Sequence, residues 1–189
     1  MNFSSKKYTA LHRFLHWSTA LLMTVLFITG FLRMKWMGKR TIKAAIEQNM
    51  SDVTYSDEQA IAVAKAVLKP MWIWHEYAAY IVFGLIAIRI VYMLIKGIRF
   101  PNPFSSRSSL KEKFQGMIYL LFYLFVIISS FTGAYLKWWK GDWKEPIEAI
   151  HKWGIYWFPI FIVLHFVGIW LAEKYEKKGI TSKMIGGEQ

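Results

Sequence analysis

Four long apolar segments limit the folds open to this chain more than any other feature of its sequence. They are 19 to 25 residues long and cover residues 14–32, 71–95, 116–136 and 153–172. An α-helix needs about 20 predominantly apolar residues to cross the hydrocarbon core of a bilayer. A membrane barrel would instead show alternating segments of about ten residues, a pattern that the sequence lacks. Helices are therefore the economical interpretation, because a helix satisfies its backbone hydrogen bonds within the lipid.

The segments predict an all-α integral membrane protein, a bundle of four transmembrane helices in one domain over residues 1–189. The expected helices cover about residues 14–34, 71–95, 116–137 and 150–173. The composition agrees, since 55% of the residues are apolar against roughly 45–50% in a soluble domain. A net charge of +12 on so apolar a chain favours basic loops beside a bilayer over nucleic-acid binding. The absence of cysteine excludes Cys-ligated zinc, iron–sulfur clusters and covalently attached c-type haem.

The connection over about residues 35–70 is the only long one between the predicted spans. Ser56-Asp57-Glu58-Gln59 predicts a capping box that opens a short helix. The apolar residues that follow recur at helical spacing: Ala60, Ile61, Val63, Ala64, Val67 and Leu68. We therefore expect an outer loop that contains a short amphipathic helix, lying on the membrane surface or against the mouth of the bundle.

The positive-inside rule leaves the orientation of the bundle undecided. If the N-terminus lies inside, the inner side carries 12 Lys and Arg residues and the outer side carries 11. Arg89, inside the second span, is the remaining one of the 24.

The histidines of the predicted spans fall at two depths. His16 opens the first span, His75 opens the second on the opposite side, and His151 opens the fourth on that same opposite side. His165 follows His151 by 14 residues, which is about 21 Å of helix at 1.5 Å per residue. Fourteen residues are also nearly four turns, so His151 and His165 share a face. The sequence thus predicts two histidine pairs, His75 with His151 and His16 with His165.

Two stacked pairs of facing imidazoles suit two bis-histidine haems in the core of a four-helix bundle. Zinc would need three or four ligands at one depth, and each depth offers two. A single interfacial histidine is more often a hydrogen-bonded structural residue, which is the interpretation favoured for His12, one turn before His16. The haem interpretation depends on four histidines at matched depths.

Two other residues repeat the 14-residue spacing. Gly30 lies 14 residues after His16, where the missing side chain would let a porphyrin approach the first helix. It could equally be a helix-packing glycine. Arg89 lies 14 residues after His75, at the depth of the His16–His165 pair. A buried arginine is costly unless it is paired, and a haem propionate is a natural partner for it.

The sequence resembles the bacterial di-haem cytochrome b561 superfamily over nearly its whole length. The motifs that carry the resemblance are Leu15-His16-Trp17, Trp74-His75-Glu76, Arg89-Ile90-Val91-Tyr92 and His151-Lys152-Trp153-Gly154 with His165. The tail, residues 180–187, resembles the C-terminus of the membrane cytochrome b subunit of respiratory nickel–iron hydrogenases.

The resemblance implies a multi-pass protein of the bacterial inner (cytoplasmic) membrane with cytoplasmic N- and C-termini. It implies two non-covalent b-type haems with bis-His ligation and exchange of electrons with quinone. By this analogy, His75 and His151 hold the outer haem and His16 and His165 hold the inner one.

The leading functional hypothesis is the electron-transfer subunit of a respiratory oxidoreductase. A redox subunit on the outer side, of a hydrogenase-like or other dehydrogenase complex, would exchange electrons with the quinone pool through the haems. Candidate quinone contacts are Gln115, Arg13 and Lys111, which a solvated loop would explain equally well.

Two alternatives stay open. One is a free-standing superoxide:quinone oxidoreductase, whose anionic substrate would be attracted by basic residues in the first outer connection: Arg33, Lys35, Lys39 and Arg40. The other is a non-redox four-helix membrane protein, such as a transporter or an assembly protein, although the sequence lacks the broken helices or repeats of many transporters.

Overall fold

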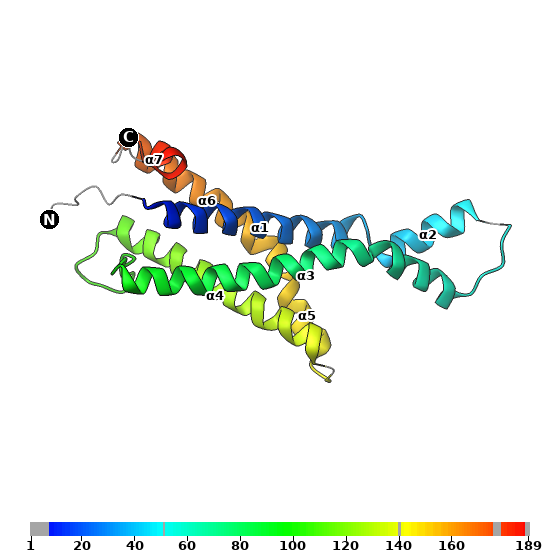
Figure 1. Cartoon of the computed structure of the whole chain (residues 1–189). Helices are drawn as coiled ribbons and strands as arrows, with labels where there is room; N and C mark the ends of the chain where they lie inside the picture. The colour runs from blue at the N-terminus through cyan, green and yellow to red at the C-terminus, as the bar shows by residue number, and fades with distance from the viewer. Residues whose placement is uncertain (1–7, 51, 140, 176–178, 188–189) are drawn as a thin grey trace. The chain divides into compact units, whose positions relative to one another are not determined.

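The computed structural model describes residues 8–50, 52–139, 141–175 and 179–187, and this part of the chain is helical without a strand. The helices, labelled in Figure 1, are α1 (Ala10–Lys35), α2 (Lys39–Asn49), α3 (Asp57–Ile95), α4 (Leu110–Trp138), α5 (Lys144–Lys152), α6 (Gly154–Tyr175) and α7 (Ile180–Gly186). Four stretches are long and apolar enough to cross a membrane: Ala10–Lys35, Asp57–Ile95, Leu110–Trp138 and Lys144–Tyr175. The predicted fold class, an all-helical protein with four membrane spans, is therefore confirmed. The fourth span consists of α5 and α6, which a turn at Trp153 separates.

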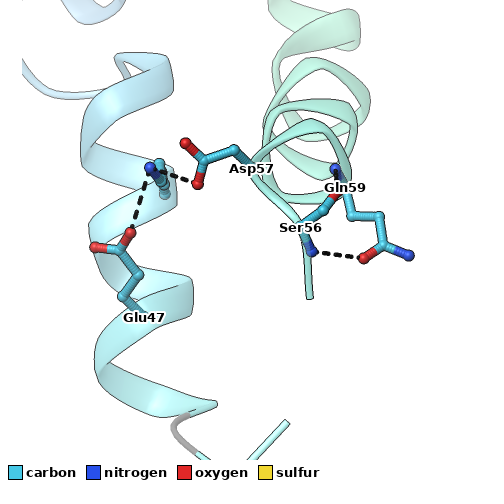
Figure 2. A network of polar contacts seen from close by, with 5 residues as sticks. Glu47, Ser56, Asp57 and Gln59 are labelled. Atoms are coloured by element: carbon cyan, nitrogen blue, oxygen red, sulfur yellow. Dashed lines mark hydrogen bonds and ion pairs between the residues drawn. The ribbon is translucent and has the colours of Figure 1, made fainter. Parts of the chain in front are cut away.

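The helix expected in the first connection is the first part of α3. The predicted capping box is present: the amide of Gln59 donates to Ser56 Oγ at 3.3 Å, and the amide of Ser56 donates to Gln59 Oε1 at 2.8 Å (Figure 2). From there α3 runs without a break through Pro70 to the end of the second span. The sequence predicted a separate short helix because proline usually ends or kinks a helix.

α2 has no counterpart in the sequence prediction. Lys43, on α2, contacts Glu47 Oε1 at 3.5 Å and Asp57 Oδ1 at 2.9 Å, which joins α2 to the start of α3 (Figure 2). The hydrogen bond to Asp57 raises the pKa of the exposed Lys43 ammonium. α2 was missed because it buries no residue and so shows no apolar run.

Two compact units make up the chain. The smaller contains Ala20–Phe83, and the larger contains the described residues up to Thr19 and from Gly84 onward. In the larger unit α4 packs against α5 and α6, and α7 packs against α6. Side chains such as Phe131, Val163 and Phe166 stay exposed on α4 and α6, as expected of surfaces that face lipid.

α4 begins at Leu110, earlier than the predicted residue 116, because Ser109 and Glu112 form a second capping box. Gly116 is buried there against the preceding loop. A Cβ at Gly116 would overlap the carbonyl oxygen of Pro101, a backbone atom that cannot rotate away. Phe100 stacks on Tyr119, with ring centroids 4.7 Å apart, and fixes the same loop on α4.

We expect Gly116→Ala to destabilise the protein by about 1–3 kcal/mol, the usual cost of overpacking. Gly168→Ala is the control, since a Cβ at Gly168 has no neighbour within 4 Å. Thermal unfolding in detergent, followed by circular dichroism, measures both variants. Equal transition temperatures for the two would show that the loop does not constrain position 116.

Candidate haem-binding sites

His16 on α1 and His165 on α6 face one another in the larger unit. Their ring centroids are 6.1 Å apart, and the ring planes are inclined by 40°. A metal–imidazole bond is about 2 Å long, so two imidazoles that bind one ion from opposite sides have ring centres roughly 6 Å apart. Both histidines are partly buried. The spacing of this pair therefore fits bis-imidazole ligation of a single iron.

Aromatic neighbours restrict both rings of the inner pair. Trp17 meets His16 edge to face at 5.4 Å between centroids. Phe161 stacks on His165 at 5.6 Å and also on Phe122 of α4 at 4.3 Å. These contacts place the two imidazoles in an apolar, aromatic environment of the kind that surrounds a porphyrin.

Arg89, on α3, adds a positive charge to the surroundings of this pair. It interacts electrostatically with the imidazoles of His16 and His165, and it is within hydrogen-bonding reach of the Tyr123 hydroxyl. Its Nε is buried and has no hydrogen-bond partner among the described residues. A buried cation in a membrane span is costly without a counter-charge, which a haem carboxylate would supply. The pair thus combines two facing imidazoles with a buried guanidinium nitrogen that a haem carboxylate could engage.

His12 has different surroundings. Its ring contacts Tyr8 at 5.4 Å and Tyr92 at 5.9 Å, and its amide donates to Thr9 Oγ1 at 3.2 Å. These contacts suit the structural role predicted for it.

His75 lies in the smaller unit, on α3. Its Nδ1 is 2.7 Å from Thr29 Oγ1 on α1, and its ring meets Trp72 edge to face at 5.5 Å. Arg33 lies one turn beyond Thr29, and its Nε is buried without a partner among the described residues. In the smaller unit, α1 therefore carries a threonine that contacts the His75 imidazole and, one turn further on, an arginine with a buried, unpartnered Nε.

His151 lies in the larger unit, at the end of α5. Its Nδ1 is 3.0 Å from Thr132 Oγ1 and 3.1 Å from the carbonyl oxygen of Ser129, both on α4. A Cβ at Gly133 would come within 3.1 Å of His151 Cε1, so the glycine lets the ring approach α4 closely. The pairing of His75 with His151 stays a prediction, as does the role of Gly30, whose Cβ position has no neighbour within 4 Å.

The sequence missed the hydroxyl residues that contact the outer histidines. Thr29 and Thr132 lie inside uncharged apolar runs, where a threonine shows no distinguishing pattern. The only available signal was their place near the depth of His75 and His151.

The candidate quinone residues differ in their surroundings. Arg13 Nη1 donates to the carbonyl oxygen of Ile185 at 3.1 Å, and its Nε is buried without a partner among the described residues. Trp17 Nε1 donates to the carbonyl oxygen of Met184 at 3.1 Å, so the C-terminal helix α7 covers this end of α1. Gln115 and Lys111 are exposed in the first turns of α4.

The donor set does not suit a zinc ion. Across the described ranges, no three His, Asp or Glu side chains come together as a metal site. Paired imidazoles are instead a common way to hold the iron of a b-type haem.

The comparison with protein families identifies the class of protein that this fold and these sites define. The family model of prokaryotic cytochrome b561 matches residues 7–187. The chain therefore belongs to the prokaryotic cytochrome b561 family, and it is a multi-pass membrane protein that transfers electrons by means of b-type haem. No curated protein and no solved structure matches the chain.

Substitution of single histidines distinguishes haem ligands from histidines that only lie near them. We expect His16→Ala to lower the haem content by about half, because one ligand of one of two sites is lost. His12→Ala is the matched control and should keep the full haem content, since its ring contacts tyrosines. The pyridine haemochrome assay on purified variants measures this. Full haem content in His16→Ala together with a loss in His12→Ala would reverse the assignment.

Arg89→Leu tests whether the positive charge of Arg89 acts on the inner haem. We expect the midpoint potential of the inner haem to fall by roughly 50–100 mV, because a unit charge beyond direct contact contributes about 1–2 kcal/mol at an effective dielectric constant of about 20. The loss of the cation removes an interaction that opposes the more positive, oxidised iron. Arg99→Leu, an exposed arginine just beyond α3, is the control. A spectroelectrochemical titration resolves the haems, and an unchanged inner potential would show that Arg89 does not interact with the inner haem.

Proposed function

We propose that this cytochrome carries electrons across the bacterial inner membrane, between a redox partner on the outer side and the quinone pool. Two b-type haems form the path, the inner one held by His16 and His165 and the outer one by His75 and His151. The observation that carries the proposal is the 6.1 Å spacing of the His16 and His165 rings, in the presence of the unpartnered Arg89 Nε.

The separation of the two sites follows from the fourth span. His151 and His165 are 14 residues apart along α5 and α6, which corresponds to about 21 Å of helix. Sites at these two depths lie near opposite faces of the hydrocarbon core, which is about 30 Å thick. The fourth span would therefore hold one ligand of each of two carriers, one near each face of the membrane.

The residues of the chain perform positioning and electrostatic tasks. A haem supplies the one-electron couple when it is bound, and the protein sets its potential by ligand identity, second contacts and burial. His16 and His165 would hold the inner iron, while Trp17 and Phe161 limit the rotation of their rings. The buried, unpartnered Nε atoms of Arg89 and Arg33 would be available to the haem carboxylates of the inner and outer sites. No proton has to move between the two haems.

The quinone binds at the inner end of the bundle in this proposal. Arg13 is one turn before His16. It donates a hydrogen bond to Ile185 of α7, which belongs to the tail that resembles hydrogenase cytochromes. Its guanidinium offers a donor to a quinone oxygen beside the inner haem. In the proposed orientation, the N- and C-termini are cytoplasmic.

The outer partner docks where basic residues gather near His75. A surface pocket of the smaller unit is lined by Lys39, Lys65 and Lys69, with Glu76 and Trp72, and the Trp72 ring contacts His75. An acidic surface of a hydrogenase-like or other dehydrogenase subunit would complement these lysines and come close to the outer haem.

The same pocket favours one second candidate, a superoxide:quinone oxidoreductase. Three lysines at a concave surface raise the local concentration of a small anion and would direct it toward His75. The two candidates differ in whether the isolated chain accepts electrons without a protein partner.

A superoxide flux distinguishes them. The purified chain is placed in quinone-containing vesicles. If the chain depends on a redox partner, superoxide should reduce the haems slowly, at a rate unchanged in Lys65→Gln/Lys69→Gln. The enzyme predicts fast reduction that falls several-fold in that variant and at high salt, because steering by charge is screened. Lys96→Gln/Lys174→Gln, at two exposed lysines of the larger unit, is the control variant. Fast, lysine-dependent reduction without a partner would contradict the partner-dependent electron carrier and support the superoxide:quinone oxidoreductase.

A further inference from the structure

Both outer histidines make the same unusual contact with a threonine of a neighbouring span. His75 Nδ1 is 2.7 Å from Thr29 Oγ1, and His151 Nδ1 is 3.0 Å from Thr132 Oγ1. The two contacts lie in different units and involve different helices. The described contacts of the inner histidines are with aromatic rings. The threonine contact is therefore a feature of the outer pair.

The proton of the Thr29 hydroxyl is already used within α1. Thr29 Oγ1 donates to the carbonyl oxygen of Val25 at 2.7 Å, with Leu26 at 3.0 Å as a second acceptor. A hydroxyl has one proton and two acceptor lone pairs, so toward His75 it acts as the acceptor. With the hydroxyl proton directed to Val25, the tautomer of His75 that satisfies this contact carries its proton on Nδ1, which leaves the lone pair of the neutral ring at Nε2.

The hydroxyl proton of Thr132 is also used within its own helix, and His151 Nδ1 faces a second acceptor there. Thr132 Oγ1 donates to the carbonyl oxygen of Ile128 at 2.7 Å, with Ser129 at 3.1 Å. His151 Nδ1 also faces the carbonyl oxygen of Ser129 at 3.1 Å, an atom that accepts only. His151 therefore carries its proton on Nδ1 as well.

Local helix chemistry alone does not produce this arrangement. Thr24 and Ser130 make the same bond to the carbonyl four residues earlier, at 2.8 Å in both cases. Among the described residues, the hydroxyl groups of Thr24 and Ser130 make no hydrogen bond to a histidine. Thr29 and Thr132 differ from them in the imidazole that they face.

We propose that Thr29 and Thr132 are positioning residues for the outer haem. Each holds the Nδ1–H of one histidine, fixes the tautomer that presents Nε2 to the iron, and makes the imidazole a more basic ligand. A carbonyl or hydroxyl that accepts from the remote nitrogen of a metal-bound histidine acts in this way in metalloproteins generally. The inference rests on the proposed function, because it requires that His75 and His151 are ligands.

A more basic ligand stabilises the oxidised iron, so loss of the acceptor should raise the midpoint potential of the outer haem. Thr29→Val and Thr132→Val keep the shape of the side chain and remove the acceptor. Thr24→Val and Ser130→Ala are the matched controls on the same helices, and Thr29→Ser restores the hydroxyl.

The experiment is a spectroelectrochemical titration of each purified variant, combined with the haem-to-chain ratio and the low-spin electron paramagnetic resonance spectrum. The outer haem is the one that disappears in His75→Ala. We expect Thr29→Val and Thr132→Val to shift its midpoint to higher potential and to change its low-spin signal, while the inner haem keeps its potential. The controls and Thr29→Ser should match the wild type.

The outcomes separate this inference from the proposed function. Full haem content in His75→Ala overturns the ligand assignment and the positioning role with it. If His75→Ala loses one haem but Thr29→Val and Thr24→Val leave the outer potential equally unchanged, the positioning role alone is overturned. Should Thr29→Val lose the outer haem, recovery of that haem in Thr29→Ser supports the role, and failure of the serine variant to recover it contradicts the role.

Discussion

Two imidazoles that face each other at the distance of a shared metal ion are the contact on which the rest of the site depends. His16 and His165 come from the first and the last spans, and their ring centroids lie 6.1 Å apart. Apolar packing alone gives no reason to place two polar rings against each other at the depth of the hydrocarbon core, where polar groups are costly. The nearby Arg89, with its buried and unpartnered Nε, adds a positive charge to the same place. A haem would resolve both problems, since its iron would take the imidazoles and its carboxylates would take the guanidinium.

The sequence predicted the spans and the histidine depths because both depend on simple periodicities. A charge-free run of about 20 residues fixes a helix in lipid, and the 14-residue interval between His151 and His165 fixes two depths on one face. The family match over residues 7–187 supports the class of membrane cytochrome that the spans suggest. Boundaries were less predictable, because α3 continues through Pro70 and α4 begins at the Ser109 cap. A proline is tolerated in a membrane helix where other groups compensate for the lost bond, a circumstance that no local pattern shows.

The residues that sequence reasoning missed act through contacts between distant segments. Thr29 and Thr132 have no motif, and their importance appears only when a neighbouring helix brings an imidazole to each hydroxyl. The tail that contains α7 carries part of the family resemblance, but no pattern in it predicts that its carbonyl groups accept hydrogen bonds from Arg13 and Trp17 on α1. Such contacts depend on how helices meet, whereas depth and amphipathicity depend on one helix at a time.

The number of haems per chain tests the central claim most directly, since one histidine pair serves one iron. The account predicts two b-type haems for each purified polypeptide, both six-coordinate and low-spin, both extractable by acidic acetone because no cysteine is present to attach them. The measurement is a pyridine haemochrome assay against quantitative amino-acid analysis of the fully loaded protein. A ratio of two supports the paired-histidine architecture, and a ratio of one or zero at full occupancy would contradict it.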